Sequence, residues 1–143
     1  MPIAPILLPE DALVRAQMIV RGKYDFAVDG GAVSTIAITS GLPIPSGSVI
    51  VGGYIDVTTQ LTSGGSATIA CQVEAANDII AAVAVASWTA GRFNILPSEA
   101  SGSLTASTYR KTTADRNISI VIATAALTAG VFNVVLKVIP PLA

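Results

Sequence analysis

Acidic side chains are the groups of this sequence best suited to acid–base chemistry, because its 143 residues include nine aspartates and glutamates and no histidine. Without histidine there is no Ser-His-Asp or Cys-His triad, no usual zinc site and no common general base. Asp56 and Glu74 fall on outward positions of neighbouring expected strands, which makes them a candidate glycosidase-like carboxylate pair. Two solvated acids on a strand surface are the plainer interpretation. We therefore expect no catalytic residue and no enzymatic activity.

Sites for metals, phosphates and cofactors are not indicated either. Asp25 and Asp29 precede Gly30-Gly31, but their spacing differs from the alternating oxygen ligands of an EF-hand loop and predicts a turn instead. The glycines follow neither the dinucleotide-binding pattern nor the P-loop pattern. We expect neither a metal ion nor a cofactor.

The composition is rich in apolar residues and poor in charge. Hydrophobic residues make up 52% and charged residues 12% of the chain, and the formal net charge is -1, whereas typical soluble domains are about 25% charged. This balance excludes an intrinsically disordered chain, and 8 basic against 9 acidic residues argue against a nucleic-acid partner. The small basic cluster of Arg110, Lys111 and Arg116 fits a solvated loop or a salt bridge to an acidic neighbour in an assembly. So few charges predict that part of the surface is buried against another protein chain.

Cys71 and Trp88 are expected to be structural residues. Cys71 is the single cysteine, so it cannot form an intramolecular disulfide, and no cation flanks it. Trp88 is expected in the core, as aromatic residues of small β-domains usually are. An alternative is a carbohydrate-binding β-sandwich, which requires that Trp88 or Tyr109 is exposed as a platform for a sugar ring.

The segment 117–136 is uncharged and long enough to cross a bilayer as a helix. Polar residues interrupt it, however, and Ile118, Ile120 and Ile122 alternate with other residues as they do in strands. Leu127–Gly130 is predicted to be a turn. We therefore expect two paired strands here and no membrane partner, and the N-terminus lacks the positive region of a signal peptide.

The chain is expected to consist of an extended arm, residues 1–14, and a single domain, residues 15–143. Prolines at positions 2, 5 and 9 predict that the arm is extended rather than helical. Either the arm lies on a neighbouring subunit or it folds back onto its own domain. Its apolar side chains are the candidate interface residues: Ile3, Ile6, Leu7 and Leu8.

The domain shows the two-residue periodicity of strands. Even-numbered positions from Ala16 to Val28 are apolar or small, those between them are mostly polar, and a turn is expected at Asp29–Gly31. A long strand is expected at 48–59, with Val49, Val51, Ile55 and Val57 on one face and a bulge or a close backbone approach at Gly52-Gly53. The other expected strands are 33–39, 67–74, 92–96, 117–124 and 131–139.

The remaining segments are expected to connect these strands. Residues 62–66 are predicted to form a hairpin loop, and 41–47 and 98–107 to form loops. Asn77–Ser87 is expected to be a short helix or loop, with a buried strand as the alternative. Many short strands, frequent turn signals and no long amphipathic helix predict an all-β fold, an antiparallel β-sandwich or jelly-roll-like domain.

Several segments also carry a resemblance to a known family. These are Tyr24–Ile36, Ile44–Ile50, Thr62–Ile69, Lys111–Ala114 and Ile122–Gly130. Together they resemble the small head decoration (cement) proteins of tailed bacteriophages. The resemblance implies a β-domain that forms trimers on the outer surface of the capsid and binds the major capsid protein across neighbouring capsomers. It carries no active-site residues, and Met1–Arg15 has no match in it.

A structural virion protein that decorates a phage head is therefore the function expected from the sequence. A tail or baseplate structural module of the same virion is the first alternative. The carbohydrate-binding β-sandwich and a hydrolase belong to other functional classes, and the sequence offers little for either.

Overall fold

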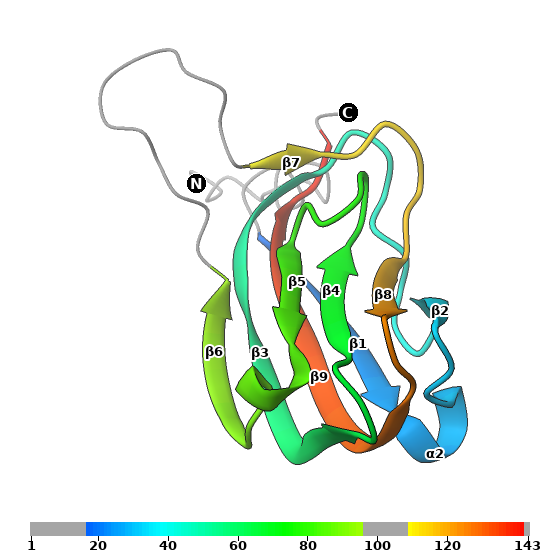
Figure 1. Ribbon diagram of the computed structural model, residues 1–143. Coiled ribbons are helices and arrows are strands. Elements are labelled where there is room, and N and C mark those ends of the chain that lie inside the picture. Colours follow the sequence, from blue (N-terminus) through cyan, green and yellow to red (C-terminus); the bar gives the residue numbers. More distant parts are fainter. Residues whose placement is uncertain (1–16, 96–108, 142–143) are drawn as a thin grey trace, which may run out of the picture.

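The protein folds into two antiparallel sheets packed face to face (Figure 1), which confirms the predicted all-β sandwich. The structure is a computed structural model that describes residues 17–95 and 109–141. Sheet A has the order β1 (Met18–Asp25), β9 (Leu127–Ile139), β3 (Val49–Ser63), β6 (Gly91–Ile95), and β7 (Arg110–Lys111) also pairs with β3. Sheet B has the order β2 (Ser34–Ile38), β8 (Ile118–Ala123), β4 (Thr68–Gln72), β5 (Ile80–Ala84).

The core forms where the inner faces of the two sheets meet. The alternation predicted for β8 is confirmed, because Ile118, Ile120 and Ile122 are buried and the residues between them are partly exposed. The ring of Phe132 on β9 packs against Tyr24 and Trp88, each with a centroid distance of 5.1 Å. The predicted core position of Trp88 is thereby confirmed, since its side chain is only 5% exposed.

The first strand ends earlier than its sequence pattern predicts. β1 stops at Asp25 and is followed by the short helix α2 (Phe26–Asp29), in which Val28 is 81% exposed. The Asp25 carboxylate accepts a hydrogen bond from the Ala27 amide at 3.1 Å, and the Asp29 carboxylate accepts one from the Asp25 amide at 2.8 Å. These local bonds cap the helical turn, so the expectation that the strand runs on to Val28 was wrong, whereas the turn at Asp29 is confirmed.

The face assignment of β3 was wrong over its first half. Ile50, rather than Val49 or Val51, is buried there, whereas Ile55 and Val57 point inward as predicted. The pairing of β3 with β9 shifts register between Ile50 and Gly52. The bulge expected from the glycine pair is thus present, and its extra residue reverses which side chains face the core.

Two predicted hairpins are connections between the sheets. β3 leads into β4 and β8 leads into β9, but in both cases the two strands belong to different sheets. The second connection turns at Thr124, which has a φ of 72°, and β9 has already begun at Leu127. The expected turn at Leu127–Gly130 and the expected pairing of 117–124 with 131–139 were therefore wrong.

The expectation of a short helix or loop at Asn77–Ser87 was only partly correct, because its middle five residues form a strand. Residues 80–84 form β5 at the edge of sheet B, and a 3-10 turn, η1 (Val85–Ser87), follows. Asn77 does not cap a helix but lies in a turn with a φ of 59°. The alternative, a buried strand, was correct in that a strand is present, but β5 is only half-buried.

Segment 117–136 contains β8 and most of β9, and no helix in the described part of the chain is long and apolar enough to cross a membrane. The arm, with Ile3, Ile6, Leu7 and Leu8, and the expected loop 98–107 lie outside the described residues.

Candidate protein interface

The candidate carboxylate pair, Asp56 and Glu74, is not formed. Asp56 lies on β3 in sheet A, where its nearest cation is Arg92 on β6, with 3.5 Å between Oδ1 and Nε. Glu74 follows β4 in sheet B and binds Arg116 instead. The two carboxylates therefore belong to different sheets and cannot share a substrate bond.

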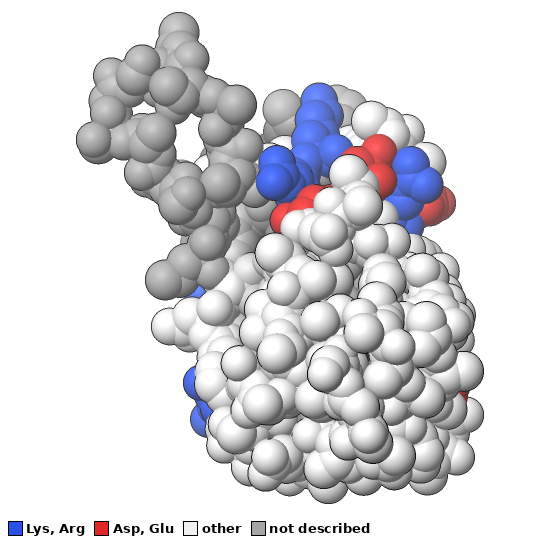
Figure 2. Space-filling view, viewed as in Figure 1, with Lys and Arg blue, Asp and Glu red and all other residues white. Residues whose placement is uncertain are grey.

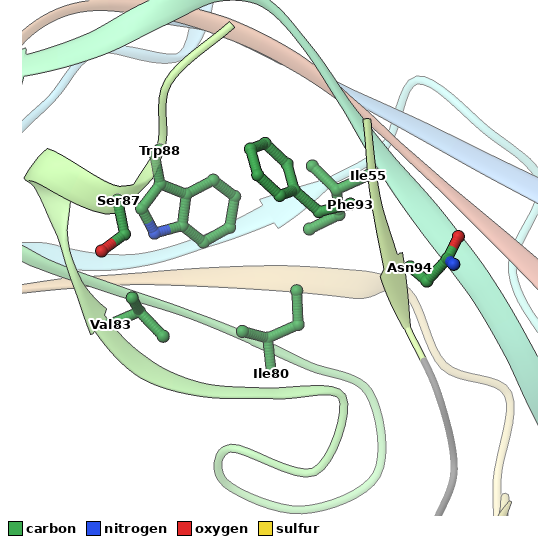
Figure 3. Close-up of a pocket in the computed structure, with 7 residues that line it drawn as sticks. All are labelled: Ile55, Ile80, Val83, Ser87, Trp88, Phe93 and Asn94. Carbon is green, nitrogen blue, oxygen red and sulfur yellow. The ribbon is translucent and has the colours of Figure 1, made fainter. Parts of the chain in front are cut away.

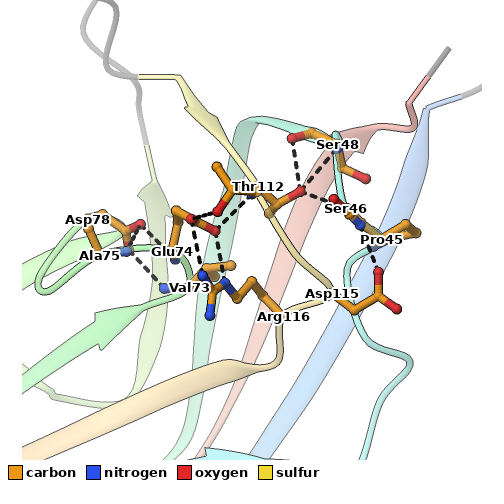
Figure 4. Close-up of polar contacts among 11 residues, drawn as sticks. Pro45, Ser46, Ser48, Val73, Glu74, Ala75, Asp78, Thr112, Asp115 and Arg116 are labelled. Carbon is orange, nitrogen blue, oxygen red and sulfur yellow. Dashed lines mark hydrogen bonds and ion pairs between the residues drawn. The ribbon is translucent and has the colours of Figure 1, made fainter.

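Glu74 ties the end of β4 to the segment between β7 and β8 (Figure 4). Its carboxylate accepts hydrogen bonds from Arg116 Nε at 2.9 Å and Nη2 at 3.2 Å. The Thr113 amide donates at 3.2 Å, and the Thr113 hydroxyl donates to the other carboxylate oxygen. The Arg116 hydrogen bond, followed by those from Thr113, lowers the pKa of Glu74 to about 2.

Asp78 holds the turn that follows β4. Its carboxylate accepts hydrogen bonds from three successive backbone amides, those of Val73 at 2.8 Å and of Glu74 and Ala75 at 2.9 Å each. Its carbonyl oxygen accepts a bond from Arg110 Nε at 3.3 Å. The side chain thus compensates for backbone groups that β4 can no longer pair.

The loop before β3 is fastened to the same end of the sandwich through a buried threonine. The Thr112 hydroxyl donates to the Pro45 carbonyl at 2.7 Å and accepts from the Ser48 amide at 3.0 Å. The Ser46 amide donates to the Asp115 carboxylate at 2.8 Å (Figure 4). Thr112 is 1% exposed, so these bonds satisfy polar groups that water does not reach.

The polar groups at this charged end of the sandwich hold loops in place. Its carboxylates are occupied by donors of the same chain, and the acidic partner of Arg116 is the chain's own Glu74 rather than a neighbouring subunit. Among residues 17–95 and 109–141 no group of three or more metal-ligating side chains comes together. Nothing in the described cluster pairs a nucleophile with a base.

The outer face of sheet A carries charges along its strands. β1 alone contributes Arg21, Lys23 and Asp25 on its outward side, and Lys23 binds Asp25 at 3.1 Å. Lys137 on β9 lies beside Gly52 of β3, and Asp56 lies beside Arg92. This face is therefore well solvated.

The outer face of sheet B is free of charge. None of its four strands contains an acidic or basic residue. Figure 2 shows this face as a broad white surface, with the charged cluster confined to one end. Alternation and register place small uncharged side chains on it: Thr35, Ala37, Thr68, Ala70, Gln72, Ala84, Ser119, Val121 and Ala123. Such a face loses little solvation energy when another protein covers it.

A cavity of about 310 Å³ lies between β5 and β6, where the two sheets part (Figure 3). Ile55 lines it from sheet A, Ile80 and Val83 line it from β5, and the Phe93 ring borders it. Phe93 is 42% exposed, which is unusual for a large aromatic side chain in a small domain. Sequence reasoning missed this cavity because its two walls come from strands that belong to different sheets.

The Trp88 indole forms one wall of the cavity. Its Nε1 is buried and has no hydrogen-bond partner among the described residues. Figure 3 shows this nitrogen on the side of the ring that faces Val83. A buried donor without an acceptor is uncommon in folded proteins.

Cys71 lies in the core, as expected. Burial, and to a lesser degree the nearby Asp78 carboxylate, raises the pKa of its thiol to about 12. The thiol therefore behaves as a small apolar side chain.

Sandwiches of this construction occur in phage capsids. No protein-family model matches the sequence, and no curated protein matches it. Similarity is found instead among solved structures, and three of these are bacteriophage capsids.

The similar chains are matched over nearly their whole lengths. One is in the capsid asymmetric unit of cyanophage Pam1, with 17% identity and a TM-score of 0.61 over 96% of this chain and 94% of that chain. Another is in the capsid of Ralstonia phage GP4, with 17% identity and a TM-score of 0.58 over 100% and 92% of the two chains. A third, in the acid-stable capsid of Helicobacter pylori bacteriophage KHP30, has 11% identity and a TM-score of 0.51 over 85% and 86%. At these identities the likeness establishes a shared fold.

Proposed function

We propose that this protein is a structural subunit of a phage virion that decorates the outer surface of the head. The observation that carries the proposal is the full-length likeness to a chain of the Pam1 capsid, which covers 96% of this chain and 94% of that one. The proteins that share the fold are thus about as long as this chain. The sequence resemblance to head decoration proteins points in the same direction.

A single small sandwich suits attachment to a shell that another protein builds. In this proposal the partner is the major capsid protein, and each decoration subunit bridges neighbouring capsomers. The protein has no catalytic role, and the carboxylates at the charged end serve to fix loops. Its contribution to the particle is contact area, at roughly 25 cal/mol for each Å² of apolar surface buried before the costs of association.

The proposed decoration unit is a homotrimer in which the charge-free outer face of sheet B contacts other copies. Its small side chains permit close approach, and it lacks charges that contact would desolvate. A closed trimer leaves no free copy of the same surface, which prevents open-ended growth. The solvated face of sheet A stays accessible in this arrangement.

The carbohydrate-binding alternative requires an exposed Trp88 or Tyr109 as a platform for a sugar ring, and this requirement is not met. Trp88 is 5% exposed and packs on Phe132, and Tyr109 is partly buried. A sugar platform needs an exposed aromatic face.

Imaging of purified virions tests the proposed location. We expect density for the protein on the outside of the head shell, in groups of three. Density on the tail or baseplate, or on the inner side of the shell, would overturn the proposal in favour of another structural role. A mass measurement of the free protein tests the oligomer separately, with a trimer expected and a monomer contradicting it.

A further inference from the structure

The cavity beside Trp88 lies between two strand edges that have no partner strand among the described residues. β5 pairs with β4 alone, and β6 pairs with β3 alone. The free edge of each strand carries backbone donors and acceptors, and the space between the two edges is lined by apolar side chains. An extended segment could therefore place apolar side chains in the cavity and pair its backbone with a strand edge.

Trp88 adds a specific requirement for the occupant. Its Nε1–H is buried and has no partner within residues 17–95 and 109–141, so the site has room for a hydrogen-bond acceptor as well as apolar atoms. The residues that line the cavity carry no charge. A charged ligand therefore does not fit, whereas a backbone carbonyl beside aliphatic side chains supplies both needs.

We propose that the cavity receives Met1–Pro9 from a neighbouring copy of this chain. The segment has no charged side chain, and it offers Ile3, Ile6, Leu7 and Leu8 as apolar side chains. Its prolines lack an N–H and favour an extended backbone with exposed carbonyls, the form in which proline-rich segments bind aromatic-lined grooves. One such carbonyl accepts the Trp88 hydrogen bond.

The segment before β1 is long enough to reach the cavity of a neighbouring copy. β1 begins at Met18 on one edge of sheet A, and β9 and β3 separate it from β6 on the other edge. Three strand spacings amount to about 14 Å, while the 16 residues before the described part extend to roughly 50 Å. An arm that leaves one edge and binds at the opposite edge of the next copy makes a head-to-tail contact, which closes into a ring under three-fold symmetry.

This inference rests on the self-association in the proposed function, but not on the location of the protein in the virion. The single tryptophan of the chain makes the first test direct, because Trp88 fluorescence reports on the cavity. In the full-length variant with Ile6→Asp and Leu7→Asp, the arm should leave the cavity, so Trp88 emission should shift to longer wavelength. A synthetic Met1–Pro9 peptide should reverse the shift, and a peptide with the same two substitutions should not.

Val28→Asp is the matched control, because Val28 is 81% exposed on α2 and its substitution should leave the emission unchanged. Emission that is the same in the arm variant and the wild type, or that does not respond to the Met1–Pro9 peptide, would overturn the proposal.

Cysteine cross-linking tests whether the arm comes from a neighbour. Differently tagged chains with Leu7→Cys and with Val83→Cys are co-expressed and oxidised, and a disulfide-linked heterodimer is expected. The control replaces Val83→Cys by Leu42→Cys, at a site that is 79% exposed elsewhere on the surface. A further variant carries Leu7→Cys and Val83→Cys in the same chain. Equal yields of the heterodimer in the two pairings, or a disulfide that forms only within this double variant, would overturn arm exchange. Both tests use the free protein, so a protein that exchanges arms but does not bind heads refutes only the proposed location.

Discussion

The Arg116 guanidinium binds the Glu74 carboxylate through two hydrogen bonds, from Nε at 2.9 Å and from Nη2 at 3.2 Å. Glu74 follows β4, whereas Arg116 precedes β8, so the pair links two neighbouring strands of sheet B beyond their last paired residues. The two-point contact fixes the orientation of both side chains as well as their distance.

The first prediction concerns pH. The pKa of Glu74 is about 2 in the folded protein against an ordinary value of 4.5, so ionised Glu74 favours the folded state. That stabilisation is fully present above about pH 4.5 and is lost as the pH falls towards 2. In the Glu74→Gln variant, the fall in urea midpoint between pH 5 and pH 2 should be smaller than in the wild type.

Asp56→Asn is the control for this experiment, since Asp56 has only the 3.5 Å contact with the largely exposed Arg92. Its urea midpoint should follow the wild-type pH dependence. Equal pH dependence in Glu74→Gln and the wild type would contradict the role assigned to the pair.

The second prediction concerns Gly53, which pairs with Leu136 where β3 runs beside β9. Its φ is 156°, and a Cβ there would clash with the Val135 carbonyl oxygen. Gly53→Ala should therefore lower the free energy of unfolding by roughly 2–4 kcal/mol. Gly64→Ala, where a Cβ would meet nothing within 4 Å, should change it by less than about 0.5 kcal/mol. Urea unfolding of both variants checks this, and equal effects would show that the close approach does not constrain position 53.

The third prediction concerns the charge-free face of sheet B. Val121→Lys places a charge at its centre, so the variant should be shifted from trimer towards monomer in a solution mass measurement while remaining folded. Val131→Lys makes the same change at a half-buried strand position on the outer face of sheet A and should leave the trimer intact. If Val131→Lys dissociates the trimer and Val121→Lys does not, the contact lies on sheet A and the prediction is wrong.

The fourth prediction concerns Cys71. A pKa of about 12 against an ordinary 9.0 leaves roughly a thousandfold less thiolate at pH 8. We expect no reaction with an aromatic disulfide reagent in the folded protein and full reaction in urea. Val28→Cys, at an exposed position on α2, should add one thiol that reacts at once. Rapid labelling of the wild type would mean that sheet B opens locally.

Local patterns in the sequence predicted strands better than the partners of those strands. Ile118, Ile120 and Ile122 were assigned correctly because alternation needs only the neighbouring residues. Their pairing was missed, because a tight connection such as that at Thr124 can either make a hairpin or pass between sheets. The choice depends on β9 packing between β1 and β3, which no local pattern records.

Failures within single strands have equally specific causes. The bulge at Gly52 reverses the alternation of β3, so Ile50 replaces Val49 in the core. The alanine-rich sequence of β5 has little strand preference, and its conformation comes from pairing with β4. The cavity beside Trp88 depends on how the strands pair and on which of their side chains face inward. The sequence therefore predicted only that Trp88 is buried.

The central position of β9 in sheet A governs the order in which the protein can mature. Met18 pairs with Val138, 120 positions further along the chain, and β3 also depends on β9 for its long edge. Such distant pairings make folding slow, and they leave a nascent chain without a finished sheet A until its last strand has been synthesised. A chain that stops before β9 therefore has neither the partner of β1 nor the long partner of β3, and it cannot form sheet A. The topology thus makes one late strand the condition for completing both faces of the sandwich.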